Sequence, residues 1–70
     1  MKKEDMTFGV VNCLRLHVQS ESNDESEIVC KLRYLTEVII DLGKSTEDFY
    51  KIYTAMGAEG FCRKELVTIT

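Results

Sequence analysis

Apolar residues between positions 24 and 42 recur at the spacing of an α-helix. Five of them follow one another at intervals of 4, 3, 4 and 3 residues, and they are Ile28, Leu32, Leu35, Ile39 and Leu42. Such intervals place side chains on one face of a helix. Ser22 with Glu25, or Asp24 with Glu27, has capping-box spacing at its start, and Gly43 suits the position just after a helix end. The pattern therefore predicts an amphipathic helix over residues 24–42, with these five residues facing the core or a dimer partner.

The apolar face of this predicted helix is wide. Val38 lies on one side of the five-residue stripe, and Val29 and Ile40 lie on the other. A surface helix needs an apolar sector of about 100°, whereas this one covers roughly half of the circumference. One small sheet is too narrow to cover that sector. We therefore expect a second helix on part of it and a second copy of the chain on the rest.

A second helix is predicted over residues 45–57. Ser45 suits the N-cap, and Glu47 and Asp48 fall in the first turn, where the helix dipole favours acids. Gly57 suits the end of the helix. The inner face of this helix would consist of Phe49, Ile52, Tyr53 and Met56.

The two ends of the chain have the alternation of β-strands. Between residues 13 and 19 polar residues alternate with apolar ones, which are Leu14, Leu16 and Val18. This period of two places the three apolar side chains on one inward face. Residues 65–70 alternate in the same way, so we expect a terminal strand there.

The segment before residue 13 leaves two interpretations open. It is rich in strand formers, so residues 6–19 predict one long strand or a bent pair, with a bulge at Gly9 or Asn12. A helix over residues 5–19 is the alternative, because Val11, Leu14 and Val18 also fit a helical stripe. The alternation and the β-branched residues favour the strand.

Together these elements predict a small α+β fold in the order strand, helix, helix, strand. The terminal strands would form a two-stranded antiparallel ribbon, which is weak by itself. Pairing its edge with a second copy would complete a four-stranded sheet, so we expect a homodimer. The chain of 70 residues forms one domain, 1–70, in which residues 1–5 are expected to be flexible.

The charge is mildly negative and unevenly distributed. The net charge is −3 at pH 7, and 44% of the residues are hydrophobic, which is typical of a globular domain. Residues 21–48 hold eight acids against three cations, a net −5, whereas the flanking segments are each +1. This distribution argues against a broad basic surface for nucleic acid.

The cysteines indicate a reducing compartment and no metal centre. Three is an odd number, unlike the even count of a secreted disulfide framework, so we expect reduced thiols in a cytoplasmic protein. No apolar run approaches the roughly 20 residues that span a bilayer, so we expect no membrane segment. The chain has residues of the types that bind zinc, namely Cys13, His17, Cys30 and Cys62. They are spaced too widely along the sequence for a typical zinc site, which takes its ligands in close pairs. On a strand, Cys13 and His17 would stand about 13 Å apart, too far to share one ion.

Catalytic motifs are absent from the sequence. His17 is the only histidine, and its place on the polar side of a strand suits an exposed residue better than a general base. The four glycines occur singly, so no glycine-rich phosphate loop is present. We therefore expect a protein that is not an enzyme and holds no cofactor.

The outer face of the first predicted helix is the candidate binding surface. One sector of it contains an aromatic residue among acids, and its members are Glu27, Tyr34, Glu37 and Asp41, with Cys30 between them. A solvated helix face is the plain interpretation. The functional interpretation is a docking surface for a basic protein, with Tyr34 as its anchor, or at the extreme a mimic of nucleic acid. A short chain without chemistry is typical of small regulatory or phage-encoded proteins, which favours an adaptor or inhibitor.

A transcriptional regulator is the alternative function. Residues 38–57 would form a helix-turn-helix unit, with Gly43 in the turn and Phe49 and Ile52 at buried positions of the recognition helix. Acids at Glu47 and Asp48 disfavour this interpretation, because they would face the DNA phosphates.

Overall fold

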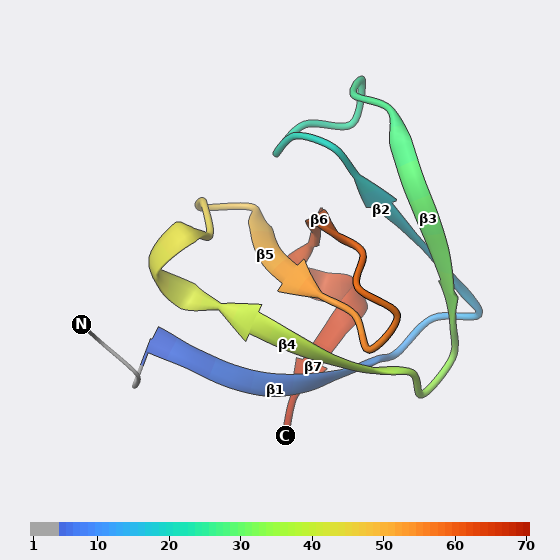
Figure 1. Ribbon diagram of the computed structural model, residues 1–70, viewed down its shortest axis with the longest axis vertical. Helices are drawn as coiled ribbons and strands as arrows, with labels where there is room; N and C mark the ends of the chain where they lie inside the picture. Colours follow the sequence, from blue (N-terminus) through green and yellow to red (C-terminus); the bar gives the residue numbers. More distant parts are fainter. Residues whose placement is uncertain (1–4) are drawn as a thin grey trace.

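The computed structural model describes residues 5–70 and consists of seven β-strands (Figure 1). The strands are β1 (Met6–Val11), β2 (Arg15–Gln19), β3 (Ile28–Arg33), β4 (Glu37–Asp41), β5 (Phe49–Tyr53), β6 (Glu59–Arg63) and β7 (Val67–Ile69). Two short 3-10 turns, η2 (Leu42–Lys44) and η3 (Lys64–Leu66), precede β5 and β7. Among residues 5–70 the structure contains no helix with the length and apolar character of a membrane span.

All seven strands belong to one antiparallel sheet in the order β3-β2-β6-β5-β4-β1-β7. The sheet curls around its own core, so the β2–β3 hairpin and the β1–β7 pair lie on different sides of the molecule (Figure 1). The molecule measures 30 × 24 × 22 Å. The contact between β2 and β6 is a single pair, Gln19 with Phe61, and it joins the β2–β3 hairpin to the rest of the sheet.

The core lies on the concave side of the sheet and is built by alternation. Its members are Val11, Leu16, Val18, Val38, Ile40, Ile52, Cys62 and Val67. Val38 and Ile40 face inward from β4, whereas Glu37 and Asp41 beside them face outward. In a strand, residues two apart share a face, and that rule assigns each of these side chains to the inside or the outside.

The predicted α+β fold and its first helix are wrong. Residues 24–42 form a loop, strand β3, a turn and strand β4. Of the five residues of the supposed stripe, only Leu32 packs against the core, while the other four are 40% to 59% exposed: Ile28, Leu35, Ile39 and Leu42. Leu35 lies in the turn with a φ of 70°, a left-handed conformation that ends any helix there.

The second predicted helix is also wrong. Residues 45–57 form a loop, β5 and the turn after it. Phe49 and Ile52 are buried as expected, but from a strand, and Met56 is 92% exposed.

The strands predicted at the two ends are confirmed. Residues 6–19 form the bent pair β1 and β2, which break at Asn12, and β7 lies in the terminal segment. Leu16 and Val18 are fully buried, but the prediction for Leu14 is wrong, because it is 83% exposed.

The predicted ribbon is only part of the sheet. β1 and β7 do pair antiparallel, but five further strands of the same chain complete the sheet. An incomplete ribbon is therefore no reason for a second copy. The expectation of a flexible segment at 1–5 lies, except for Asp5, outside the described residues.

The buried thiol of Cys62 makes stability sensitive to high pH. Burial raises the pKa of Cys62 from 9.0 to about 12, and the nearby Cys13 adds to the shift. Below pH 9 the Cys62 thiol is protonated in both the folded and the unfolded chain. Above pH 9 only the unfolded chain readily loses this proton. Between pH 7 and 10 we expect the wild type to lose about 1.4 kcal/mol more unfolding free energy than Cys62→Ala. Urea titrations at both pH values measure this difference, and parallel losses in the two proteins would contradict it.

Candidate functional site

The convex outer face of the sheet carries two hollows of different chemistry. We call one the apolar hollow; it encloses about 190 Å³ and is lined by Phe8, Glu37, Val38, Ile39, Tyr53 and Ala55. We call the other the basic hollow; it encloses about 170 Å³ and is lined by Arg15, His17, Gln19, Asp24, Phe49, Arg63 and Leu66. Both volumes are below the roughly 300 Å³ at which small-molecule pockets begin, so each suits one side chain or one small group.

The apolar hollow is formed by a row of side chains on three neighbouring strands. Phe8 of β1 stands opposite Ile39 of β4, and Ile39 stands opposite Tyr53 of β5. Opposed residues of antiparallel strands point to the same face and contact each other. Phe8 is 61% exposed and Ile39 is 40% exposed, so the row is open to solvent.

Carboxylates border this apolar row. Glu37 lines the hollow, Asp41 follows Ile39 on the same face of β4, and Glu59 stands opposite Tyr53. Lys51 is the cation among them, and its Nζ lies 3.1 Å from a carboxylate oxygen of Glu59. The same Nζ lies 5.6 Å from the centre of the Tyr53 ring. The border of the apolar hollow is therefore net negative.

The outer face of the β2–β3 hairpin carries the opposite charge. Arg15 stands opposite Arg33, and His17 stands opposite Lys31. All four residues are exposed. We call these four residues together with Arg63 of β6 the basic face. Arg15 and Arg33 are like charges on opposed positions, an arrangement that destabilises a sheet, so folding alone gives no reason for it.

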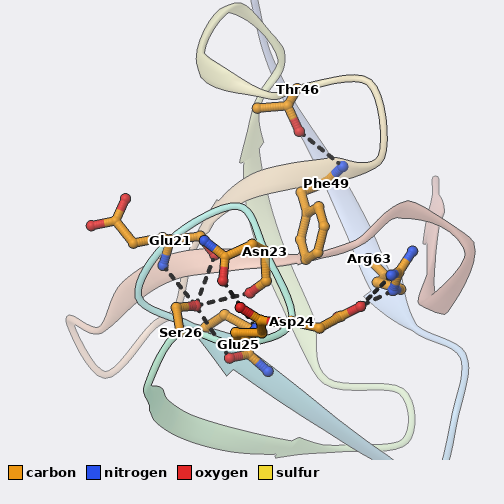
Figure 2. A network of polar contacts seen from close by, with 9 residues as sticks. Glu21, Asn23, Asp24, Glu25, Ser26, Thr46, Phe49 and Arg63 are labelled. Atoms are coloured by element: carbon orange, nitrogen blue, oxygen red, sulfur yellow. Dashed lines mark hydrogen bonds and ion pairs between the residues drawn. The ribbon is translucent and has the colours of Figure 1, made fainter.

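Arg63 reaches the basic hollow from β6 and is held there by a loop. Its guanidinium lies 5.2 Å from the centre of the Phe49 ring, which forms the floor. Its Nε donates a 3.2 Å hydrogen bond to Asp24, and a second guanidinium nitrogen donates to the other oxygen of the same carboxylate (Figure 2). This hydrogen bond, and then the charge of Asp24, raise the pKa of Arg63.

The loop that supplies Asp24 is ordered by one serine (Figure 2). The Ser26 hydroxyl lies within hydrogen-bonding distance of the Asn23 and Glu21 carbonyl oxygens and accepts from the Glu21 N–H. It also lies 3.3 Å from the side-chain oxygen of Gln19, on the wall of the basic hollow. The Asp24 carboxylate is thereby held at the hollow without a regular element to support it.

The four predicted partner-binding residues do not form one surface. Glu37 and Asp41 do share the outer face of β4, and Glu37 lines the apolar hollow. Glu27 and Tyr34 flank β3 at its two ends, about 23 Å apart at the rise of a strand. The acidic helix face therefore does not exist, but half of its residues border the apolar hollow.

The helix-turn-helix unit predicted for residues 38–57 is wrong, because that segment forms β4, η2, β5 and the turn after it. Among residues 5–70, no group of three or more metal-ligating side chains is close enough to hold an ion. His17 is exposed on the outer face of β2, as its place in the alternation predicts.

Neither hollow was predicted from the sequence, although a local signal for each was present. The run from Glu37 to Asp41 alternates, which places Ile39 among acids on the outer face. The run from Cys30 to Arg33 alternates too, which places Lys31 and Arg33 outside. What brings these positions beside Phe8 or Arg15 is the strand pairing, and no local pattern specifies it.

Comparison of the sequence with models of known protein families and with curated proteins finds no match.

Proposed function

We propose that this protein is a small non-enzymatic protein-binding module, an adaptor or inhibitor, whose apolar hollow receives a basic segment of its partner. The observation that carries the proposal is the row Phe8, Ile39 and Tyr53, three large side chains in register on adjacent strands. Phe8 and Ile39 are exposed, and Tyr53 is half-buried beside them. Contiguous apolar surface on a small protein is typical of an interaction site.

The size of the hollow supports a peptide side chain as the occupant. About 190 Å³ is too little for a cofactor but enough for one aliphatic or aromatic side chain. Aromatic residues such as Phe8 and Tyr53 are also the kind that dominate binding energy at protein interfaces. A partner would insert one apolar side chain between them.

The charge around the hollow supports a basic partner. Glu37 and Asp41 lie on either side of Ile39 along β4, and the cation nearby, Lys51, is engaged by Glu59. A lysine or arginine next to the inserted side chain would meet these carboxylates, and their field would speed association. The preferred segment therefore combines an apolar residue with a neighbouring cation.

Peptide selection tests this proposal. A random-peptide library displayed on phage is selected on the wild-type protein after depletion on Phe8→Ala. We expect the enriched peptides to share an apolar residue beside lysine or arginine. For a synthetic peptide of that sequence, calorimetry should show about tenfold or greater weakening with Phe8→Ala, because truncation of a central aromatic anchor costs about 2 kcal/mol.

The matched control is Leu14→Ala, which truncates another exposed apolar side chain that does not line the hollow. It should leave the affinity unchanged. Glu37→Lys should weaken the basic peptide by slowing its association. Enrichment of acidic peptides, or equal affinity for wild type and Phe8→Ala, would contradict the proposal.

A further inference from the structure

The fold gathers cations that lie far apart in the sequence. The basic face draws Arg15 and His17 from β2, Lys31 and Arg33 from β3, and Arg63 from β6. It therefore holds four of the nine lysines and arginines of a chain whose net charge is −3. This concentration on one side of the molecule is invisible in the linear distribution of charge.

Three of these cations have no acidic partner within the described residues. The ion pairs among residues 5–70 are Lys51 with Glu59 and Arg63 with Asp24, which leaves Arg15, Lys31 and Arg33 unneutralised. Arg15 and Arg33 are like charges directly opposite each other, an arrangement that destabilises a sheet. A surface that carries this cost without internal compensation suits an external anion.

The basic hollow shows which chemistry fits. Arg15, His17 and Arg63 line it together, and the Asp24 carboxylate already forms two hydrogen bonds with the Arg63 guanidinium there. A phosphate offers the same pair of oxygens to a guanidinium. The Asp24 side chain is more than half exposed, so an incoming phosphate can replace it.

We propose that the basic face binds the phosphate groups of a single-stranded nucleic acid. Acids cluster in the loop at the tip of the β2–β3 hairpin, namely Glu21, Asp24, Glu25 and Glu27. The Arg15–Arg33 pair lies at the other end, about 13 Å along the strand from Gln19, which exceeds the Debye length of about 8 Å. A flexible strand can follow the cations and turn away from the acids. A duplex, stiff over about 150 base pairs, cannot bend away from the acids in this way.

Fluorescence anisotropy with a labelled oligothymidylate tests this proposal. If four phosphates are bound, the logarithm of the association constant should fall with the logarithm of salt concentration with a slope of about −3. The double variant Arg15→Gln/Arg33→Gln should bind at least about tenfold more weakly at low salt, with a slope near −1.4. Asp24→Asn, which releases Arg63, should bind more tightly with an unchanged slope, because the same four cations meet phosphates.

Lys44→Gln is the matched control, because it removes an exposed cation of η2 outside the basic face and should leave binding unchanged. Circular dichroism verifies that each variant is folded. No binding by the wild type, or equal binding by wild type and the double variant, would overturn the proposal. Tighter binding of a duplex of the same length would overturn the assignment to single strands. Displacement by inorganic phosphate at an equal concentration of phosphate groups would assign the face to free phosphate instead.

Discussion

Replacing Gly60 with alanine should destabilise the protein by about 3 kcal/mol, because the new methyl group has no space. Gly60 lies in β6, where that strand approaches β2 most closely. A Cβ atom there would lie 2.5 Å from the carbonyl oxygen of Gln19 and 2.7 Å from a methyl carbon of Val18. Both neighbours are held by the sheet and the core, so neither can move without breaking other contacts. For a domain of 70 residues this loss is a large part of the total stability.

The matched control for this substitution is Gly43→Ala. A Cβ atom at Gly43 would lie 3.0 Å from a carboxylate oxygen of Asp5, the far end of a side chain that can shift. It would lie 3.4 Å from a carboxylate oxygen of Asp41, which is an ordinary van der Waals contact. This change should alter the unfolding free energy by no more than about 0.5 kcal/mol. Chemical denaturation of the three proteins measures both effects. If Gly60→Ala unfolded at the same denaturant concentration as wild type, β6 would not approach β2 as closely as described.

The helix expected over residues 24–42 was wrong because the spacing of apolar residues did not reveal the turn between two strands. Two strands joined by a tight turn happened to place apolar residues at helical intervals. The turn contains no glycine, proline or asparagine, because Leu35 itself adopts the left-handed conformation. Its backbone is held by hydrogen bonds to β1: the Leu35 N–H donates to the Val11 carbonyl, and the Val11 N–H donates to the Thr36 carbonyl. Those partners lie more than twenty residues away in sequence, so no local sequence pattern predicts the turn.

The second expected helix failed for a different reason. Ser45 and Thr46 have the residue types of a helix cap, and they do satisfy backbone groups, but at the entrance to a strand. The Ser45 hydroxyl donates to the Asp41 carbonyl and accepts from the Lys51 N–H. The Thr46 hydroxyl accepts from the Phe49 N–H (Figure 2). Serine and threonine form hydrogen bonds with backbone groups at turns of several kinds. Their presence therefore does not by itself distinguish the start of a helix from the start of a strand.

The candidate surfaces were harder to predict than the strands because they depend on pairing. Alternation at β2 and in the terminal segment was sufficient to predict those strands, since the period of two is contained in the sequence itself. The apolar hollow requires Phe8, Ile39 and Tyr53 to be in register, and the basic face requires β2 to pair with β3. The two surfaces differ in charge and lie on different strands, so one small chain has room for an acidic-bordered docking site and a cationic one.

Two adjacent isoleucines distinguish the strand from the helix in one experiment. Ile40 is fully buried, and its terminal methyl would lie only 2.8 Å from a Cβ atom placed on Gly9. Ile39 is 40% exposed and lines the apolar hollow. Ile40→Ala should therefore cost about 3–4 kcal/mol of unfolding free energy, and Ile39→Ala about 1 kcal/mol. In the helix first expected here, Ile39 would occupy the centre of the buried stripe and Ile40 its flank, and the order would be reversed. Both substitutions remove the same atoms and the same β-propensity, so each controls for the other. A larger loss from Ile39→Ala in urea denaturation would show that β4 does not face the core as described.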